Sequence, residues 1–212
     1  MKNILVINTS VNRSSSISRK LVDYFVNGIV QNNYEYSIDY RDLAVELPPH
    51  ISHDWITSDR RESSSRTAEE KILLLQSDEY INELIHSDII VLACPMYNWS
   101  IPSHLKAYLD HVLRFNETFG IAAGAGNVRY KGLLKSKRLL LIMTRGSSDY
   151  QFGGRNSHMD FQSGYLKLIF SIMGIDNITE ITVDGLNDVP QVRESNINKA
   201  SNQLSEFIAS HL

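Results

Sequence analysis

Five short runs rich in apolar and β-branched residues recur along the chain, separated by longer segments with a different periodicity. Runs of this kind are typical of strands that are buried on both faces of a sheet. The runs are Asn3–Asn8, Tyr36–Tyr40, Asp88–Ala93, Arg138–Met143 and Ile178–Val183. Since parallel strands need long crossover connections, this alternation predicts an α/β architecture.

The intervening segments predict five helices. One is expected from about Met159 to Met173, where Gly174 ends it. The other four have apolar residues at helical spacing, at Ile17, Leu21, Tyr24, Phe25 and Gly28; at Ile72, Leu73, Tyr80, Leu84 and Ile85; at Leu105, Tyr108, Leu109, Val112 and Leu113; and at Ile197, Ala200, Leu204, Phe207 and Ile208. We therefore expect a single domain over residues 1–212, a three-layer sandwich whose five-stranded parallel sheet has helices on both faces.

Composition favours a cytoplasmic enzyme. The 21 basic and 24 acidic residues give a net charge of −3, which provides no electrostatic reason to bind nucleic acid or an anionic membrane. The single cysteine cannot form an internal disulfide, and no Cys/His set has zinc spacing, so we expect no metal. The apolar runs are far shorter than the ~20 residues of a membrane span, and the N-terminal run is too short for a signal peptide.

Three connections are longer than such a fold needs: Ala44–Arg66, Asn116–Lys131 and Gly146–His158. Long loops in a compact domain are usually functional lids or disordered segments. The second and third follow the third helix and the fourth strand. We therefore expect them to cover a site at the carboxyl ends of the strands.

The segment after the first strand, Thr9–Arg19, contains six hydroxyl residues. It has neither the glycines and lysine of a P-loop nor the glycines of a dinucleotide-binding turn. However, a helix N-terminus with several hydroxyls can bind a phosphate through charge-assisted hydrogen bonds of ~1.5–3 kcal/mol each. The alternative interpretation is a serine-rich helix cap followed by a surface loop.

Two other strand ends have unusual compositions. The loop Pro95–Pro102 is rich in aromatic residues and bounded by prolines, so it either offers a flat surface to a planar ring or forms an aromatic corner of the core. In the turn Thr144–Ser148, Gly146 permits close approach of a ligand. Arg145 either places its charge beside that ligand or pairs with a nearby acid.

Ligands of open parallel sheets bind outside the carboxyl ends of the strands, where the strand order reverses. A phosphate pocket, an aromatic platform and a glycine-containing turn at that edge match the phosphate, ribityl chain and isoalloxazine ring of flavin mononucleotide. The three loops together therefore predict bound FMN.

Several blocks of sequence carry a resemblance to a known family. They are Ser10, Ser16-Ile17-Ser18, Arg41-Asp42-Leu43, Pro95-Met96-Tyr97-Asn98, Leu105, Lys106, Tyr108, Asp110, Thr118-Phe119, Gly132-Leu133-Leu134 and Thr144-Arg145-Gly146. Over nearly its whole length the chain resembles the FMN-dependent NADH:quinone oxidoreductase and azoreductase family, which has a flavodoxin-like fold. The Pro-Met-Tyr-Asn block and the helix after it are the most specific part of the match.

The resemblance implies roles for individual residues. Those implied to bind FMN are Ser10, Ser16, Ile17 and Ser18 at the phosphate, Pro95, Met96, Tyr97, Asn98 and Trp99 along the ring, and Thr144, Arg145, Gly146 and Ser147 at its pyrimidine end. Phe119 and Phe161 are implied to line the substrate slot. The resemblance also implies a homodimer with FMN sites at the subunit interface.

The implied reaction is a ping-pong reduction of quinones or azo compounds by NADH or NADPH. Both substrates use one slot in turn, and N5 of the flavin carries the hydride, so we assign no side chain a catalytic role. Trp99 stands where the family usually has Phe, Ser147 replaces a second glycine, and Gly146–His158 is longer than usual. Our hypothesis is that this long loop changes the choice of substrate.

The sequence also leaves other interpretations open. The departures from the family favour, as an alternative, a flavin-dependent tailoring enzyme that acts on a specific metabolite, and the fold also fits a flavodoxin-like electron carrier. Cys94 ends an apolar strand and is expected to be a buried core residue, with a redox role beside the ring as the alternative. His104 and His111 lack further ligands and are not expected to bind metal.

Overall fold

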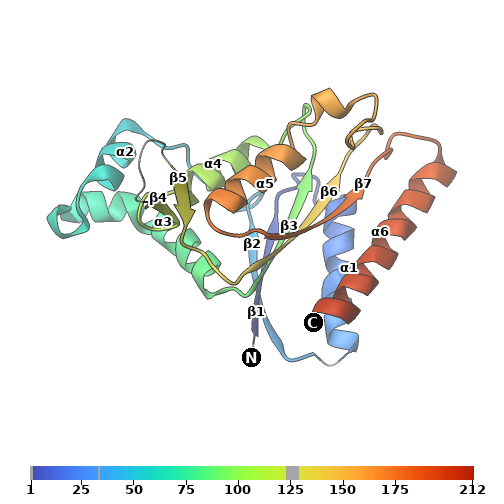
Figure 1. Cartoon of the computed structure of the whole chain (residues 1–212), viewed down its shortest axis with the longest axis horizontal. Coiled ribbons are helices and arrows are strands. Elements are labelled where there is room, and N and C mark those ends of the chain that lie inside the picture. Colours follow the sequence, from blue (N-terminus) through green and yellow to red (C-terminus); the bar gives the residue numbers. More distant parts are fainter. Residues whose placement is uncertain (1, 33, 123–128) are drawn as a thin grey trace.

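The computed structural model describes residues 2–32, 34–122 and 129–212 (Figure 1). Its main sheet has five strands in the order β2-β1-β3-β6-β7, and all neighbouring strands are parallel. The strands are β1 (Lys2–Asn8), β2 (Tyr36–Asp42), β3 (Ile89–Pro95), β6 (Arg138–Thr144) and β7 (Asn177–Val183). The predicted α/β class and all five strands are confirmed, each within two residues of its expected ends.

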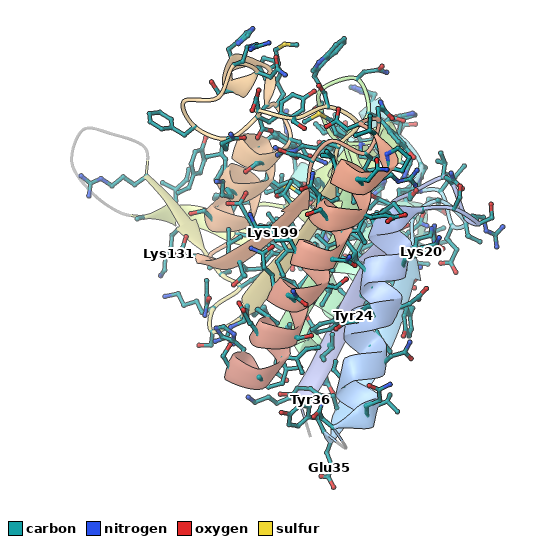
Figure 2. The ribbon with its side chains drawn as sticks, turned by 90° about the vertical axis from the view of Figure 1, so that its right-hand side faces the viewer. Lys20, Tyr24, Glu35, Tyr36, Lys131 and Lys199 are labelled. Carbon is teal, nitrogen blue, oxygen red and sulfur yellow. The ribbon has the colours of Figure 1, made fainter. Side chains whose placement is uncertain are left out.

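Helices cover both faces of this sheet, as predicted. On one face, α1 (Ile17–Gln31) and α6 (Pro190–His211) pack side by side over one buried apolar cluster (Figure 2). Tyr24, labelled on α1 in Figure 2, joins the two helices through a hydrogen bond of its hydroxyl with Ser205 (2.8 Å). The other face is covered by α3 (Ala68–His86), α4 (Ser103–Val112) and α5 (Ser163–Ile172), which enclose a second cluster.

Two of the long connections contain regular structure that the periodicity did not predict. The first holds α2 (His53–Arg60) and a short 3₁₀ turn, η1 (Ser63–Ser65). The second holds β4 (Phe119–Ala122), which pairs antiparallel with β5 (Arg129–Gly132); residues 123–128 lie outside the described part of the chain. These four elements are too short to show a clear apolar period.

Tertiary contacts explain the position of α2. Arg114 is completely buried and its Nε donates a hydrogen bond to Asp59 of α2 (2.6 Å). The same guanidinium donates to the Ser77 hydroxyl (3.1 Å) and pairs with Asp78, both on α3. A buried cation with these partners ties α2 to α3, although sequence spacing gives no sign of it.

The helix predicted from about Met159 to Met173 begins later than expected. A short 3₁₀ turn, η2 (Ser157–Met159), comes first, and α5 starts only at Ser163. The cause is Asp160, whose Oδ1 accepts hydrogen bonds from the amides of the N-cap residue Gln162 (3.0 Å) and of the first helical residue Ser163 (2.9 Å). At the other end Gly174, with φ of +95°, ends the helix as predicted.

Candidate functional site

The loop after β1 forms an open cradle at the N-terminus of α1. Ser16 is the N-cap: its Oγ accepts a hydrogen bond from the Arg19 amide (3.3 Å) and lies 3.0 Å from the Ser18 Oγ. Ser10, Ser16 and Ser18 are all buried. Within the described residues, the amides of Ile17 and Ser18 have no hydrogen-bond acceptor. Free amides, hydroxyls and a helix N-terminus together suit an anion.

Arg19 stabilises this cradle from behind. Its guanidinium donates to the Ser10 carbonyl (2.7 Å) and makes a two-pronged ion pair with Asp42 at 2.6 and 2.8 Å. Burial acts to raise the pKa of Asp42, but hydrogen bonds from Arg19 and from the Ala44 amide outweigh it and leave that pKa below its usual 3.8. The positive charge of Arg19 is therefore neutralised within the protein, and its role is to hold the loop.

The loop after β3 contains a tight two-residue turn. Tyr97 and Ser100 exchange backbone hydrogen bonds of 2.9 and 3.0 Å, and both central residues have positive φ, 48° at Asn98 and 65° at Trp99. Such a turn is unusual for a tryptophan, and backbone strain of this kind is concentrated at functional sites. Trp99 is 50 % exposed. The Tyr97 hydroxyl accepts a hydrogen bond from the Val11 amide (3.3 Å), which connects this turn to the cradle.

A cavity of about 420 Å³ lies between this turn and the loop after β6. Five of its lining residues were predicted from the sequence: Met96, Asn98, Trp99, Gly146 and Ser147. Four were not predicted: Tyr150, Asn156, Met159 and Asn187. None of the nine is charged, so the cavity suits a neutral ring.

Asn187 carried no sequence signal because it belongs to a different loop, after β7. The backbone N–H of Asn187 donates to the Gly146 carbonyl (2.9 Å), which brings the two loops together beyond the strand ends. A Cβ at position 146 would lie only 2.5 Å from Asn187 Nδ2, so a larger residue there would require the Asn187 side chain to move.

Four other residues predicted in these loops do not line the cavity: Pro95, Tyr97, Thr144 and Arg145. Pro95 and Thr144 are opposite each other in the ladder between β3 and β6, and both are buried. Arg145 is also buried, and its Nη2 pairs with Asp160 (2.8 Å). For its side chain, the structure therefore favours pairing with a nearby acid, the second of the two possibilities that the sequence left open.

The two residues expected at a substrate slot lie apart. Phe119 lies in β4, with its ring 6.0 Å from that of Phe115 and 5.8 Å from that of Tyr130. Phe161 lies before α5, is 63 % exposed and lines a separate cavity of about 710 Å³ with Ile101 and Tyr165 among its other walls. Phe119 does not line this cavity. Within a single chain, therefore, Phe119 and Phe161 do not line a common slot.

Cys94 is a buried core residue, as predicted. It has no exposed surface, and burial raises the pKa of its thiol to about 12, with hydrogen bonds from Gln162 and Thr9 only partly opposing this. A thiol in this state is not a nucleophile. His104 Nε2 donates a hydrogen bond to the Thr9 carbonyl (2.7 Å), so it supports the base of the cradle.

The donors and the apolar surface of these loops match the chemical groups of FMN. The segment Thr9–Arg19 has no carboxylate, and its free amides and hydroxyls match a dianionic phosphate. The uncharged cavity is bordered by further amides without acceptors among the described residues, at Asn98, Trp99, Gly146 and Ser147. An apolar tryptophan face and free donors are what a polar, flat ring system requires. The residues present therefore fit FMN.

Over the described residues, none of the helices combines the length and apolar character needed to cross a membrane. The same residues contain no cluster of three or more His, Cys, Asp or Glu side chains arranged to hold a metal ion.

The sheet order and the loops at its carboxyl edge define an α/β protein of flavodoxin type. The model of the flavodoxin-like fold family matches residues 2–208 of the sequence. The chain belongs to this family, and curated proteins are similar to it along their full length.

Two such relatives are named as quinone oxidoreductases. A protein of Nostoc sp. named FMN-dependent NADH:quinone oxidoreductase is 34 % identical over 209 residues, which are 99 % of each chain. A protein of Pseudomonas fluorescens named FMN-dependent NADH:quinone oxidoreductase 2 is 34 % identical over 206 residues, 97 % of this chain and 99 % of that one.

Solved structures share the fold at lower identity. An azoreductase from Bacillus anthracis superposes with a TM-score of 0.87 at 23 % identity, covering 98 % of this chain and 99 % of that one. An FMN-dependent NADH-azoreductase from the same species, solved in complex with FMN, has a TM-score of 0.83 at 22 % identity and covers 98 % and 100 % of the two chains.

Proposed function

We propose that the protein is an FMN-dependent oxidoreductase that takes a hydride from NADH or NADPH and reduces quinones and azo compounds. The observation that carries this proposal is the pairing of an amide-rich cradle with an uncharged cavity, joined by the Tyr97–Val11 hydrogen bond. Full-length relatives named FMN-dependent NADH:quinone oxidoreductase support the same activity. The azo acceptors follow from the sequence resemblance.

In this proposal, the chain binds and orients the cofactor at three places. The amides of Ile17 and Ser18 and the hydroxyls of Ser10 and Ser16 bind the phosphate. Met96 and Trp99 pack along the ring, while the amides of Gly146 and Ser147 donate hydrogen bonds at its pyrimidine end. Bound FMN supplies the hydride-accepting and hydride-donating chemistry, so the protein contributes stacking, orientation and electrostatics.

The acceptor slot is proposed to lie next to the two exposed aromatic side chains, Trp99 and Phe161. Support comes from their exposure and from the apolar cavity of about 710 Å³ beside Phe161. We further propose a homodimer in which a second chain completes each slot. Exposed apolar surface for such a contact is provided around the β4–β5 hairpin by Phe115, Ile121 and Tyr130. Sedimentation of the FMN-loaded protein tests whether it is a dimer.

Steady-state kinetics test the proposed reaction. With NADH as donor and 2-methyl-1,4-naphthoquinone as acceptor, we expect turnover without a protein partner and parallel lines in double-reciprocal plots, because one slot serves both substrates in turn. An electron carrier does not oxidise NADH with a free quinone. A tailoring enzyme gives NADH oxidation that free quinones do not accelerate. Intersecting lines contradict the ping-pong order.

The Gly146–His158 loop is proposed to set the choice of acceptor. Tyr150 and Asn156 belong to it and line the ring cavity, while Phe152 at its tip is fully exposed. The same assay over a panel of quinones and azo dyes tests this role. Shortening the loop is expected to change the relative rates, and an unchanged ranking of acceptors contradicts the proposal.

A further inference from the structure

A polar cluster lies beside the exposed aromatic residues, and we call it the Arg145 cluster: Arg145, Asp160 and Gln162. Arg145 and Gln162 are buried, and Asp160 also borders the cavity of about 710 Å³ beside Phe161. Arg145 Nη2 pairs with Asp160 Oδ2 at 2.8 Å, and Arg145 Nε donates to Gln162 Oε1 at 3.0 Å. Arg145 is 4 % exposed and Gln162 has no exposed surface. These are charge-assisted contacts in a poorly solvated place, where hydrogen bonds are strong and a missing partner is costly.

The Arg145 cluster joins the ends of two strands to the start of α5. Arg145 follows β6, and Gln162 Nε2 donates to the carbonyl of Cys94, near the end of β3 (2.9 Å). Asp160 uses its second oxygen, Oδ1, for the two amides that begin α5. Each polar group of the Gln162 side chain and each oxygen of Asp160 thus has a partner.

Phe161 lies in the chain between Asp160 and Gln162, and it is also tied to the turn after β3. Its amide donates to the carbonyls of Trp99 and Met159, each at 3.1 Å. The Ser100 hydroxyl donates to the Phe161 carbonyl at 3.4 Å. The backbone of Phe161 is therefore fixed on both sides, although its ring is 63 % exposed.

We propose that Asp160 and Gln162 are positioning residues, which through Arg145 hold Phe161 against the Trp99 turn and so set the geometry of the acceptor slot. This inference rests on the proposed function, because the slot is defined there as the space beside these two rings. It assigns the Arg145 side chain to the support of the slot rather than to the flavin. A network in which the polar groups of Asp160 and Gln162 are all partnered is suited to fixing one arrangement of two exposed rings. Arg145 Nη1 adds a longer ion pair with Asp184 (3.8 Å).

Two substitutions remove the links without removing the rings. Asp160→Asn keeps an oxygen for the α5 amides but loses the charge that pairs with Arg145. Gln162→Leu keeps the approximate volume but loses the bonds to Arg145 and Cys94. For each we expect the KM for the quinone to rise about tenfold, with kcat and the dissociation constant of FMN changing less than about twofold.

A double-mutant cycle with Phe161→Ala shows whether the effect passes through Phe161. If the Arg145 cluster acts by holding that ring, Asp160→Asn has no further effect on KM once the ring is absent. Additive effects on KM contradict the proposal, and so does a rise in the FMN dissociation constant equal to that in KM. Asp176→Asn is the matched control: Asp176 accepts a hydrogen bond from Ser171 (2.5 Å) at the far end of α5, and its loss leaves KM unchanged.

Hydrogen exchange provides a readout that does not depend on activity. In both FMN-loaded variants, we expect the protection factors of peptides covering residues 159–163 to fall about tenfold or more. Peptides from α1 and α3 are expected to keep their protection. Unchanged protection at 159–163 overturns the proposal even if activity falls. If the original chain does not reduce quinones, the proposed function is contradicted. Loss of protection in the variants would then still support the positioning role of Asp160 and Gln162. If one variant does not fold, the other decides the outcome.

Discussion

Replacing Ser16 by Asp is expected to weaken FMN binding by about a hundredfold or more and to leave the fold unchanged. Aspartate is as good an N-cap as serine, so α1 keeps its first turn. The new carboxylate, however, points into the cradle proposed for a phosphate dianion. Two unit charges 4 Å apart repel by about 4 kcal/mol at an effective dielectric constant of 20, which is enough for such a loss. Fluorescence titration of the protein with FMN measures it.

Two controls make this result specific. Ser16→Asn also caps the helix but adds no charge, so it should lower FMN affinity only slightly. Ser52→Asp introduces the same carboxylate at the N-cap of α2, where Ser52 accepts from the Trp55 amide (3.1 Å), and should leave FMN affinity unchanged. If Ser16→Asp binds FMN as tightly as the original chain, the phosphate does not lie at the N-terminus of α1.

Replacing Gly132 by Ala is expected to destabilise the fold by about 3 kcal/mol, at the upper end of the usual cost of overpacking. A Cβ at this position would lie 2.1 Å from both the Cα and the backbone nitrogen of Gly174. Backbone atoms cannot rotate away as a side chain does, and Gly174 itself has φ of +95°. The contact between the end of β5 and the turn before β7 must therefore open. Urea unfolding measures the loss as a lower midpoint.

Gly164→Ala is the matched control for this prediction. Gly164 lies in the first turn of α5, and a Cβ there meets no atom within 4 Å. Alanine in a helix costs less conformational entropy than glycine, so the variant should gain about 0.5–1 kcal/mol. Equal stability of Gly132→Ala and the original chain would show that the backbones at 132 and 174 are not in close contact.

The regular part of the fold could be predicted because its sequence periods are long and strong. The apolar runs of β1, β3 and β6 are buried on both faces, and the carboxyl edge of a parallel sheet follows from strand direction alone. The position of α2 could not be predicted, since a single buried cation, Arg114, holds it in place through Asp59 and Asp78. The late start of α5 depends similarly on one carboxylate, that of Asp160.

In the candidate site, too, the local segments could be predicted and the long-range partners could not. Its first and second loops follow strands with clear boundaries, so the segments Thr9–Arg19 and Pro95–Pro102 could be singled out, whereas the roles of individual residues in them came from the family resemblance. Asn187 lies far away in sequence and reaches the cavity only because the loops after β6 and β7 pair beyond the strand ends. The direction of the Arg145 side chain is set by Asp160 and Gln162, whose positions depend on the packing of α5. Such long-range partners leave no local pattern.

The absorbance spectrum of the purified full chain, recorded before and after anaerobic addition of NADH, tests the central claim most directly. We expect flavin bands in the protein as isolated or after reconstitution with FMN, their bleaching by NADH, and their return on addition of a quinone. A chain that binds no flavin even after incubation with FMN contradicts the cofactor site built from these three loops. Bound flavin that NADH does not reduce contradicts the proposed oxidoreductase.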